Sequence, residues 1–145
     1  ELVRELNIIL KKKFVLVGSN WKKYHPNALE SNYSDKYAED LYRGNICIDF
    51  GSKNSDKCIY PRSSKIIESG GLLLQSICSD SKEILNNLFD KTCFFSLKDM
   101  KEKVSFFLKN SDQINSLLIM QQKNFESEHF NYKSIKKIEN FINNK

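Results

Sequence analysis

Four short apolar runs, each followed by a segment with helical periodicity, limit the possible folds of this sequence more than any other feature. The runs are 14–18, 46–50, 72–75 and 92–95. They are largely apolar, without strict alternation of apolar and polar residues, which is typical of strands with helices on both faces of their sheet. Alternation of such strands with helices favours a parallel sheet. We therefore predict an α/β, Rossmann-like three-layer domain with a parallel sheet of four to five strands and C-terminal helices.

Local signals place the helices between these strands. Ser34 and Ser96 precede helical segments as N-cap residues, and Asp80 and Glu83 have the spacing of a capping box. Gly44 follows a helical segment, where glycine commonly ends a helix. The predicted helices span about 1–12, 34–42, 63–69, 80–89 and 132–141, with two more beginning at Ser96 and Ser111.

The length of 145 residues fits one domain. No apolar run approaches the ~20 residues that a membrane-spanning helix needs, and no secretory signal pattern follows Glu1. Because the chain begins with Glu rather than Met, we expect residues 1–145 to be a single domain from a larger two-domain protein.

The cysteines Cys47, Cys58, Cys78 and Cys93 form no Cys-x-x-Cys pair. Their spacing fits neither a zinc site nor a small disulfide scaffold, so we predict no metal site. Cys47, Cys78 and Cys93 lie in or beside predicted strands, where buried free thiols are the usual state. Free thiols suit a reducing compartment, and we expect a cytoplasmic location.

The formal net charge is +5, and Lys11–Lys13 is the densest basic run. A solvated lysine-rich surface explains most excesses of this size. A positive field would also favour a nucleotide diphosphate or an anionic membrane. No aromatic-basic motif of the known nucleic-acid-binding families supports such a function, so we expect no nucleic-acid partner and leave peripheral association with the inner face of a membrane open.

The segment from Gly51 to Gly71 is the most informative for function. It passes from a strand end through a polar loop into a helix that begins near Arg62 and Ser63. A helix N-terminus suits phosphate, and an arginine there can add forked hydrogen bonds. The alternative is that Ser63 only caps the helix and Arg62 pairs with a surface carboxylate. Gly70 and Gly71 form either a helix cap with a tight turn or a close approach to ligand.

Several other residues have a structural and a functional interpretation. His25 lies in the loop after the first predicted strand, either solvated or facing the cleft. Trp21 could stack on a base or pack under its loop. Asp49 and Asp56 could pair as carboxylates, although a metal site needs more converging ligands. No G-x-G-x-x-G or P-loop motif is present, which argues against a standard dinucleotide or ATP loop.

Residues from about Phe14 to Tyr132 resemble the C-terminal domain of GT-B-fold glycosyltransferases, in the group similar to bacterial spore-maturation glycosyltransferases. The strongest match is Arg62, the helix after it, and the run Ser69-Gly-Gly-Leu-Leu-Leu74. The other matching segments are Val15–Gly18 with Trp21, Tyr37-Ala38, Leu41-Tyr42, Ile46–Phe50 and His129–Tyr132.

The resemblance implies a nucleotide-sugar-binding domain that holds the nucleotide diphosphate of an activated sugar donor, while a missing N-terminal domain holds a glycan, lipid or protein acceptor. The donor is a substrate, and no cofactor is expected. The matching positions give the nucleotide-sugar-binding residues Gly18, Arg62, Ser63, Ser64, Lys65, Glu68, Gly70 and Gly71. The catalytic residues are not identified, and this domain alone is expected to transfer no sugar.

One position departs from the resemblance. The family usually has a ribose-binding glutamate three residues after the arginine, and this chain has Lys65 there. Either Glu68 substitutes from one helical turn further on, or Lys65 contacts phosphate, or the site is altered or inactive. The alternative function is a non-catalytic α/β binding or interaction module.

Overall fold

The computed structural model describes residues 2–10, 13–30, 32, 34–51 and 61–129. The chain divides into two compact units, Glu1–Tyr37 and Ala38–Lys145. The first unit contains α1 (Leu2–Leu10) and the short 3-10 helix η2 (Trp21–Lys23). Helix α2 (Asp35–Tyr42) crosses the boundary between the units. Its start matches the predicted cap, because the Ser34 hydroxyl accepts a hydrogen bond from the Tyr37 N–H at 3.2 Å.

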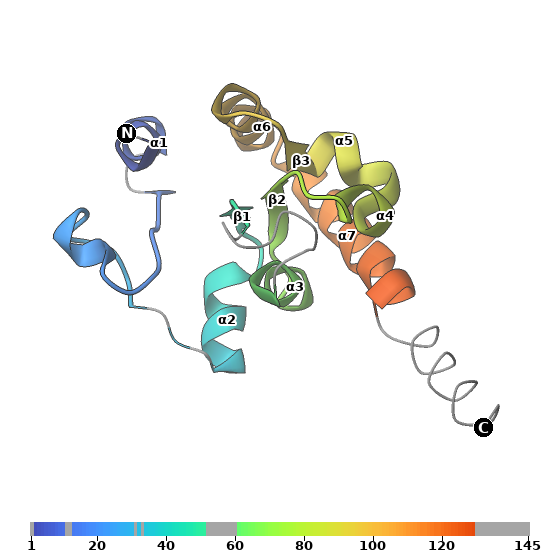
Figure 1. Cartoon of the computed structure of the whole chain (residues 1–145), viewed down its shortest axis with the longest axis horizontal. Helices are drawn as coiled ribbons and strands as arrows, with labels where there is room; N and C mark the ends of the chain where they lie inside the picture. Colours follow the sequence, from blue (N-terminus) through green and yellow to red (C-terminus); the bar gives the residue numbers. More distant parts are fainter. Residues whose placement is uncertain (1, 11–12, 31, 33, 52–60, 130–145) are drawn as a thin grey trace. The chain divides into compact units, whose positions relative to one another are not determined.

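The second unit is built on a parallel sheet with the strand order β1-β2-β3 (Figure 1). The strands are β1 (Ile46–Asp49), β2 (Leu72–Ser76) and β3 (Cys93–Phe94). The helices between and after them are α3 (Pro61–Glu68), α4 (Ser81–Leu85), η3 (Asn86–Leu88), α5 (Phe89–Thr92), α6 (Leu97–Lys109) and α7 (Asp112–His129). The predicted α/β class with a parallel sheet is confirmed.

The described residues form three strands rather than the predicted four to five. The apolar run 14–18 joins no strand of this sheet, and its one bridge pairs Val17 with Leu29. Around that bridge the Gly18 N–H donates to the Leu29 carbonyl at 3.0 Å, and the Leu29 N–H donates to the Leu16 carbonyl at 2.8 Å. An apolar run indicates burial but does not specify its partner, and here the partner is the end of the run's own loop.

Strand β2 is buried on both faces, whereas the first three residues of β1 are partly buried. Leu73 of β2 and Cys47 of β1 are register partners and pack with residues of α3 and α7. The core cluster on this face contains Ile66, Ile67, Leu73, Ile84 and Phe125. Leu72 and Leu74 alternate with Leu73 and are fully buried as well. This burial on both faces explains why three successive residues of the strand, Leu72 to Leu74, are all apolar.

The helix predicted over 80–89 is divided in the structure. Asn86 has a positive φ of 47°, and the chain forms α4, η3 and α5 in succession. Asparagine tolerates this conformation better than most residues. The side-chain amide of Asn124 on α7 donates to the Leu85 carbonyl at 3.0 Å, which supplies a partner for the end of α4.

Helix α6 begins as predicted. The Ser96 hydroxyl accepts from the Asp99 N–H at 3.2 Å, and the Asp99 carboxylate accepts from the Phe95 N–H at 3.0 Å. This reciprocal pair supplies partners at the helix start. The helix predicted over 132–141 lies outside the described residues. Within the described ranges, none of the helices has the length and apolar character needed to cross a membrane.

Gly71 fills the tight turn between α3 and β2. A Cβ at this position would lie 2.9 Å from the Tyr42 carbonyl oxygen and 3.0 Å from Cγ2 of Ile66. We expect Gly71→Ala to lower the free energy of unfolding by about 1–3 kcal/mol, because overpacked sites must shift backbone or side chains.

Urea denaturation of this variant tests the expectation, with Gly44→Ala as the control. Gly44 has a φ of 70°, and an added Cβ would meet nothing within 4 Å. The control therefore loses only about 1 kcal/mol from left-handed backbone strain. If the Gly71 variant has wild-type stability, the turn can relax and the close packing is not restrictive.

Candidate functional site

The buried carboxylate of Asp49 lies at the end of the sheet where the strands have their carboxyl ends. Asp49 ends β1 and is 1% exposed. Its side chain accepts hydrogen bonds from Arg62 Nε at 3.3 Å, Arg62 Nη2 at 2.5 Å and the Ser63 hydroxyl at 2.7 Å. The Gly51 N–H adds a fourth bond at 2.9 Å. Asp49 therefore joins the end of β1 to the first turn of α3.

The surroundings of Asp49 favour its ionised form. Burial by itself raises the pKa of the carboxyl group. The hydrogen bonds from Arg62 and Ser63, the charge of Arg62 and the Gly51 N–H outweigh that effect, so the pKa lies below its ordinary value. Asp49 is therefore a charged anchor at neutral pH and not a proton donor.

Gln75 occupies the neighbouring position on β2. It is the register partner of Asp49 on one side and of Cys93 on the other. Register partners in a parallel sheet present their side chains to the same face. Gln75 is 1% exposed, and its Nε2 donates to Cys78 Sγ at 3.4 Å. Its Oε1 is buried and has no hydrogen-bond partner among the described residues, which is uncommon for a buried polar atom.

Two thiols continue the row of polar groups beyond Gln75. Cys78 Sγ lies 3.0 Å from the Ser81 hydroxyl, and that hydroxyl also accepts a hydrogen bond from the Cys78 N–H at 2.9 Å. Burial raises the pKa of Cys93 to about 12, and burial also raises the pKa of Cys47 to about 12. The thiols of Cys47 and Cys93 therefore stay protonated at neutral pH, and both are poor nucleophiles. Cys47, Cys78 and Cys93 are free, as the sequence indicates.

The N-terminus of α3 brings four of the predicted site residues together. Arg62 is half-exposed, and Asp49 engages two of its three guanidinium nitrogens. Ser63 is fully buried and bonded to Asp49, so its hydroxyl has a structural role. Ser64 and Lys65 follow in the first turns and are partly buried. Pro61 starts the helix, and its lack of an N–H costs nothing at this position.

The other end of α3 lies at the opposite edge of the sheet. The Gly70 N–H bonds to the Ile67 carbonyl at 3.0 Å, and the Gly44 N–H, just before β1, bonds to the Gly70 carbonyl at 2.8 Å. Gly70 has a φ of 79°, so this glycine ends the helix. Gly70 and Gly71 therefore form a helix end and a tight turn rather than a close approach to ligand, and they lie at the other end of α3 from Arg62.

Glu68 is likewise distant from the start of α3. It is the last residue of the helix, six residues after Arg62, a rise of roughly 9 Å. A cavity of about 230 Å³ adjoins it, lined by Ile67, Glu68, Gln122, Phe125 and Glu126. Two carboxylates in that lining favour cations rather than phosphate. The geometry does not bring Glu68 into the Asp49 site as a replacement for the expected glutamate.

Gly18 lies in the first unit and packs against an aromatic ring. A Cβ there would lie 2.9 Å from Cδ1 of Trp21, and its φ is 142°. Trp21 contacts Tyr24 edge to face, with 6.2 Å between ring centroids. His25 contacts Phe14 in the same way at 5.9 Å. Local packing thus accounts for Gly18 and for one side of the Trp21 ring.

The described residues offer no metal centre. Among them, no three His, Cys, Asp or Glu side chains converge to hold an ion. Asp56 and Cys58 lie outside the described residues, so the suggested pairing of Asp49 with Asp56 is not tested. Within the described part of the chain, Asp49 instead takes Arg62 as its charged partner.

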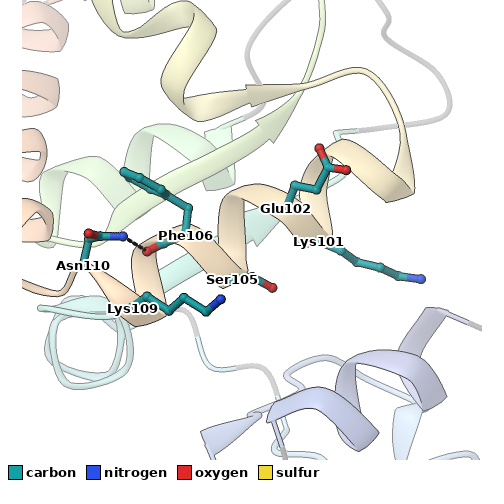
Figure 2. A pocket seen from close by; sticks show the side chains of 6 residues that line it. All are labelled: Lys101, Glu102, Ser105, Phe106, Lys109 and Asn110. Atoms are coloured by element: carbon teal, nitrogen blue, oxygen red, sulfur yellow. Dashed lines mark hydrogen bonds between the residues drawn. The ribbon is translucent and has the colours of Figure 1, made fainter.

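A second hollow of about 410 Å³ lies along α6. Figure 2 shows its lining, in which the Asn110 amide donates to the Phe106 carbonyl at 2.8 Å. The lining consists of Lys101, Glu102, Ser105, Phe106, Lys109 and Asn110. These are residues of one helix and its end, without the buried, converging polar groups of a ligand site.

Sequence reasoning did not identify Asp49 as the partner of Arg62, nor Gln75 as part of the same edge. The available signal was position, because Gln75 ends one predicted strand and Asp49 is the last residue but one of another. A polar side chain at the carboxyl end of a parallel strand is well placed for ligand or helix contacts.

Searches of protein-family models, of curated proteins and of solved structures found no match to this chain.

Proposed function

We propose that this chain is the nucleotide-sugar-binding domain of a glycosyltransferase and that the diphosphate of the donor binds at the start of α3. The observation that carries the proposal is the buried Asp49, which holds Arg62 at the carboxyl edge of a parallel sheet. Ligands of open α/β sheets bind beyond this edge. The α3 N-terminus adds a partial positive charge and backbone N–H groups directed at an anion.

The geometry of the arginine supports a phosphate ligand. Asp49 engages Nε and Nη2, which fixes the plane of the guanidinium group, while half of the side chain stays exposed. A pre-oriented guanidinium loses little freedom on binding and can form paired hydrogen bonds with phosphate oxygens. Lys65 lies three residues further along the same helix, so a second cation is near the same face.

The unpartnered Gln75 oxygen supports a ligand that also carries hydroxyl groups. A phosphate has only acceptors, whereas Gln75 Oε1 needs a donor. Ribose or sugar hydroxyl groups supply such donors. The GT-B glycosyltransferases that this chain resembles have a ribose-binding glutamate at the position of Lys65. In this chain the Gln75 oxygen on β2 would accept the ribose hydroxyl in place of that glutamate.

The chemistry proposed for the domain is electrostatic. In sugar transfer, the bond from the anomeric carbon to the diphosphate breaks, and negative charge develops on the leaving oxygen. Arg62 and the N–H groups at the start of α3 would stabilise that charge without moving. The acceptor and its base would come from another domain.

Titration of the ¹⁵N-labelled chain with UDP, GDP, ADP and CMP, followed by NMR, tests the proposal. We expect one nucleotide to shift the amides of Gly51, Arg62, Ser63 and Ser64. Arg62→Lys keeps a cation beside Asp49 but removes the paired geometry, so we expect affinity to fall about tenfold. The control is Arg43→Lys, at an exposed arginine that pairs with Glu39.

Two results would reject this site. One is the absence of shifts at the start of α3 with every nucleotide. The other is equal loss of affinity in the Arg62 and Arg43 variants, which would indicate a diffuse charge effect.

A non-catalytic binding module remains the alternative, since Asp49 already engages Arg62 and Lys65 replaces the expected glutamate. Nucleotide release from a bound sugar donor, measured with an acceptor-binding domain added, separates the two functions.

A further inference from the structure

The chain gathers positive charge between the end of α1 and the start of α2. Residues 11–29 contain five lysines, no arginine and no acidic residue. The same range contains Phe14, Trp21 and Tyr24. The described lysines of this range, Lys13, Lys22 and Lys23, are all exposed. A basic segment with aromatic residues is a candidate surface for an anionic partner.

The structure holds part of this segment in a defined turn. The Trp21 carbonyl accepts from the Tyr24 N–H at 2.9 Å and from the His25 N–H at 2.8 Å. Asn20 precedes the turn with a positive φ of 68°. The backbone pairing of Gly18 with Leu29 closes the loop, and Ala28 anchors it in the interior of the unit.

This turn presents rings and ammonium groups together. Tyr24 is 74% exposed and Trp21 is 39% exposed. Lys23 Nζ lies 5.6 Å from the centre of the Tyr24 ring, and Lys22 forms an exposed ion pair with Glu30. Such surface pairs contribute little and exchange readily. The basic turn, defined as Trp21–Tyr24, thus combines two amphipathic rings with two exchangeable cations.

We infer that the basic turn binds the surface of an anionic membrane, with Trp21 and Tyr24 at headgroup depth and the lysines against lipid phosphates. Trp and Tyr favour the membrane–water interface because one end of each ring is apolar and the other polar. Each lysine near an anionic surface adds to the attraction. The turn is already ordered, so little conformational freedom is lost on binding.

Two features favour a membrane over a nucleic acid. Residues 11–29 contain no arginine, the residue that most often reads bases and stacks on them. Val15 and Leu29, on either side of the turn, are exposed aliphatic side chains. Such side chains gain by entering the acyl boundary of a bilayer but gain little against a phosphate backbone. The inference is independent of the proposed nucleotide site.

Trp21 is the only tryptophan of the chain, so its fluorescence reports on this turn alone. The experiment adds vesicles of phosphatidylcholine, or of equal parts phosphatidylcholine and phosphatidylglycerol, to the full chain. We expect a blue shift of emission and co-sedimentation only with the anionic vesicles, both weakening as salt is raised. Lys22→Ala/Lys23→Ala should weaken binding roughly 30-fold.

The matched control is Lys82→Ala/Lys91→Ala, which removes the same charge from exposed positions in the second unit. It should bind within about twofold of wild type, because the inference places the lipid contacts in the basic turn and none on these two lysines. Binding to neutral vesicles with equal affinity, or equal weakening in both double variants, would overturn the inference. So would a blue shift that inorganic phosphate or RNA produces as well as vesicles do.

Discussion

Replacing Asp49 with alanine is expected to lower the free energy of unfolding by about 2–4 kcal/mol. The carboxylate accepts four hydrogen bonds, two of them from a charged guanidinium group. Its loss also leaves the hydroxyl of Ser63, which is fully buried, without its acceptor. The half-exposed Arg62 can be rehydrated, so the cost falls mainly on the buried groups.

Urea denaturation of Asp49→Ala measures the effect, and Asp40→Ala is the matched control. Asp40 is exposed on α2, so its removal should change stability by no more than about 0.5 kcal/mol. Equal stability of the two variants would mean that Asp49 does not anchor α3. In that case Asp49 would not set the orientation of Arg62, and the pre-organisation argument for the phosphate site would fail.

The same carboxylate predicts a dependence of stability on pH. The pKa of Asp49 is lower in the folded protein than its ordinary value, so its ionised form contributes stability above the unfolded pKa of about 3.9. That contribution is lost as pH falls through the lower folded pKa. We therefore expect the stability difference between wild type and Asp49→Asn to be constant near neutral pH and to shrink below about pH 4.

The sequence predicted the parts of the fold that depend on local pattern. The runs 46–50 and 72–75 became β1 and β2 with ends shifted by one residue. The run 92–95 shortened to β3, because Thr92 completes α5 and Phe95 is exposed. The pairing partner of the run 14–18 could not be predicted from local pattern, because its bridge to Leu29 depends on how the intervening loop closes.

The candidate site was only partly readable because its decisive contacts join distant residues. The sequence suggested an anion-binding helix start at Arg62 or, alternatively, an arginine paired with a surface carboxylate. The observed partner is the buried Asp49, thirteen residues earlier on another element. Glu68 was placed one turn beyond Lys65, but the direction of α3 carries it to the opposite edge of the sheet.

Gln121 was not singled out by the sequence, yet its substitution by leucine is expected to cost about 2–5 kcal/mol. Its Oε1 accepts from the Leu73 N–H at 2.9 Å, and its Nε2 donates to the Leu73 carbonyl at 3.1 Å. Both residues are fully buried. Leucine at this position would leave two backbone groups without partners in a dry interior.

The reason for this contact is the shortness of β3. The Leu72 N–H donates to Asn45 on the β1 side, so the polar groups of Leu73 point to the other edge of β2. β3 pairs only with Gln75 and Ser76, further along that edge. The Gln121 amide on α7 therefore replaces the missing strand at Leu73.

Urea denaturation together with native-state hydrogen exchange tests this role. Gln121→Leu should lower global stability and remove protection of the Leu73 amide. The control is Gln122→Leu, which loses one partly buried bond to the Ile67 carbonyl and should cost about 1 kcal/mol or less. If the Leu73 amide stays protected in Gln121→Leu, another group or water must complete this edge. β2 would then be held without α7, and the position of Gln75, two residues further on, would not depend on that helix.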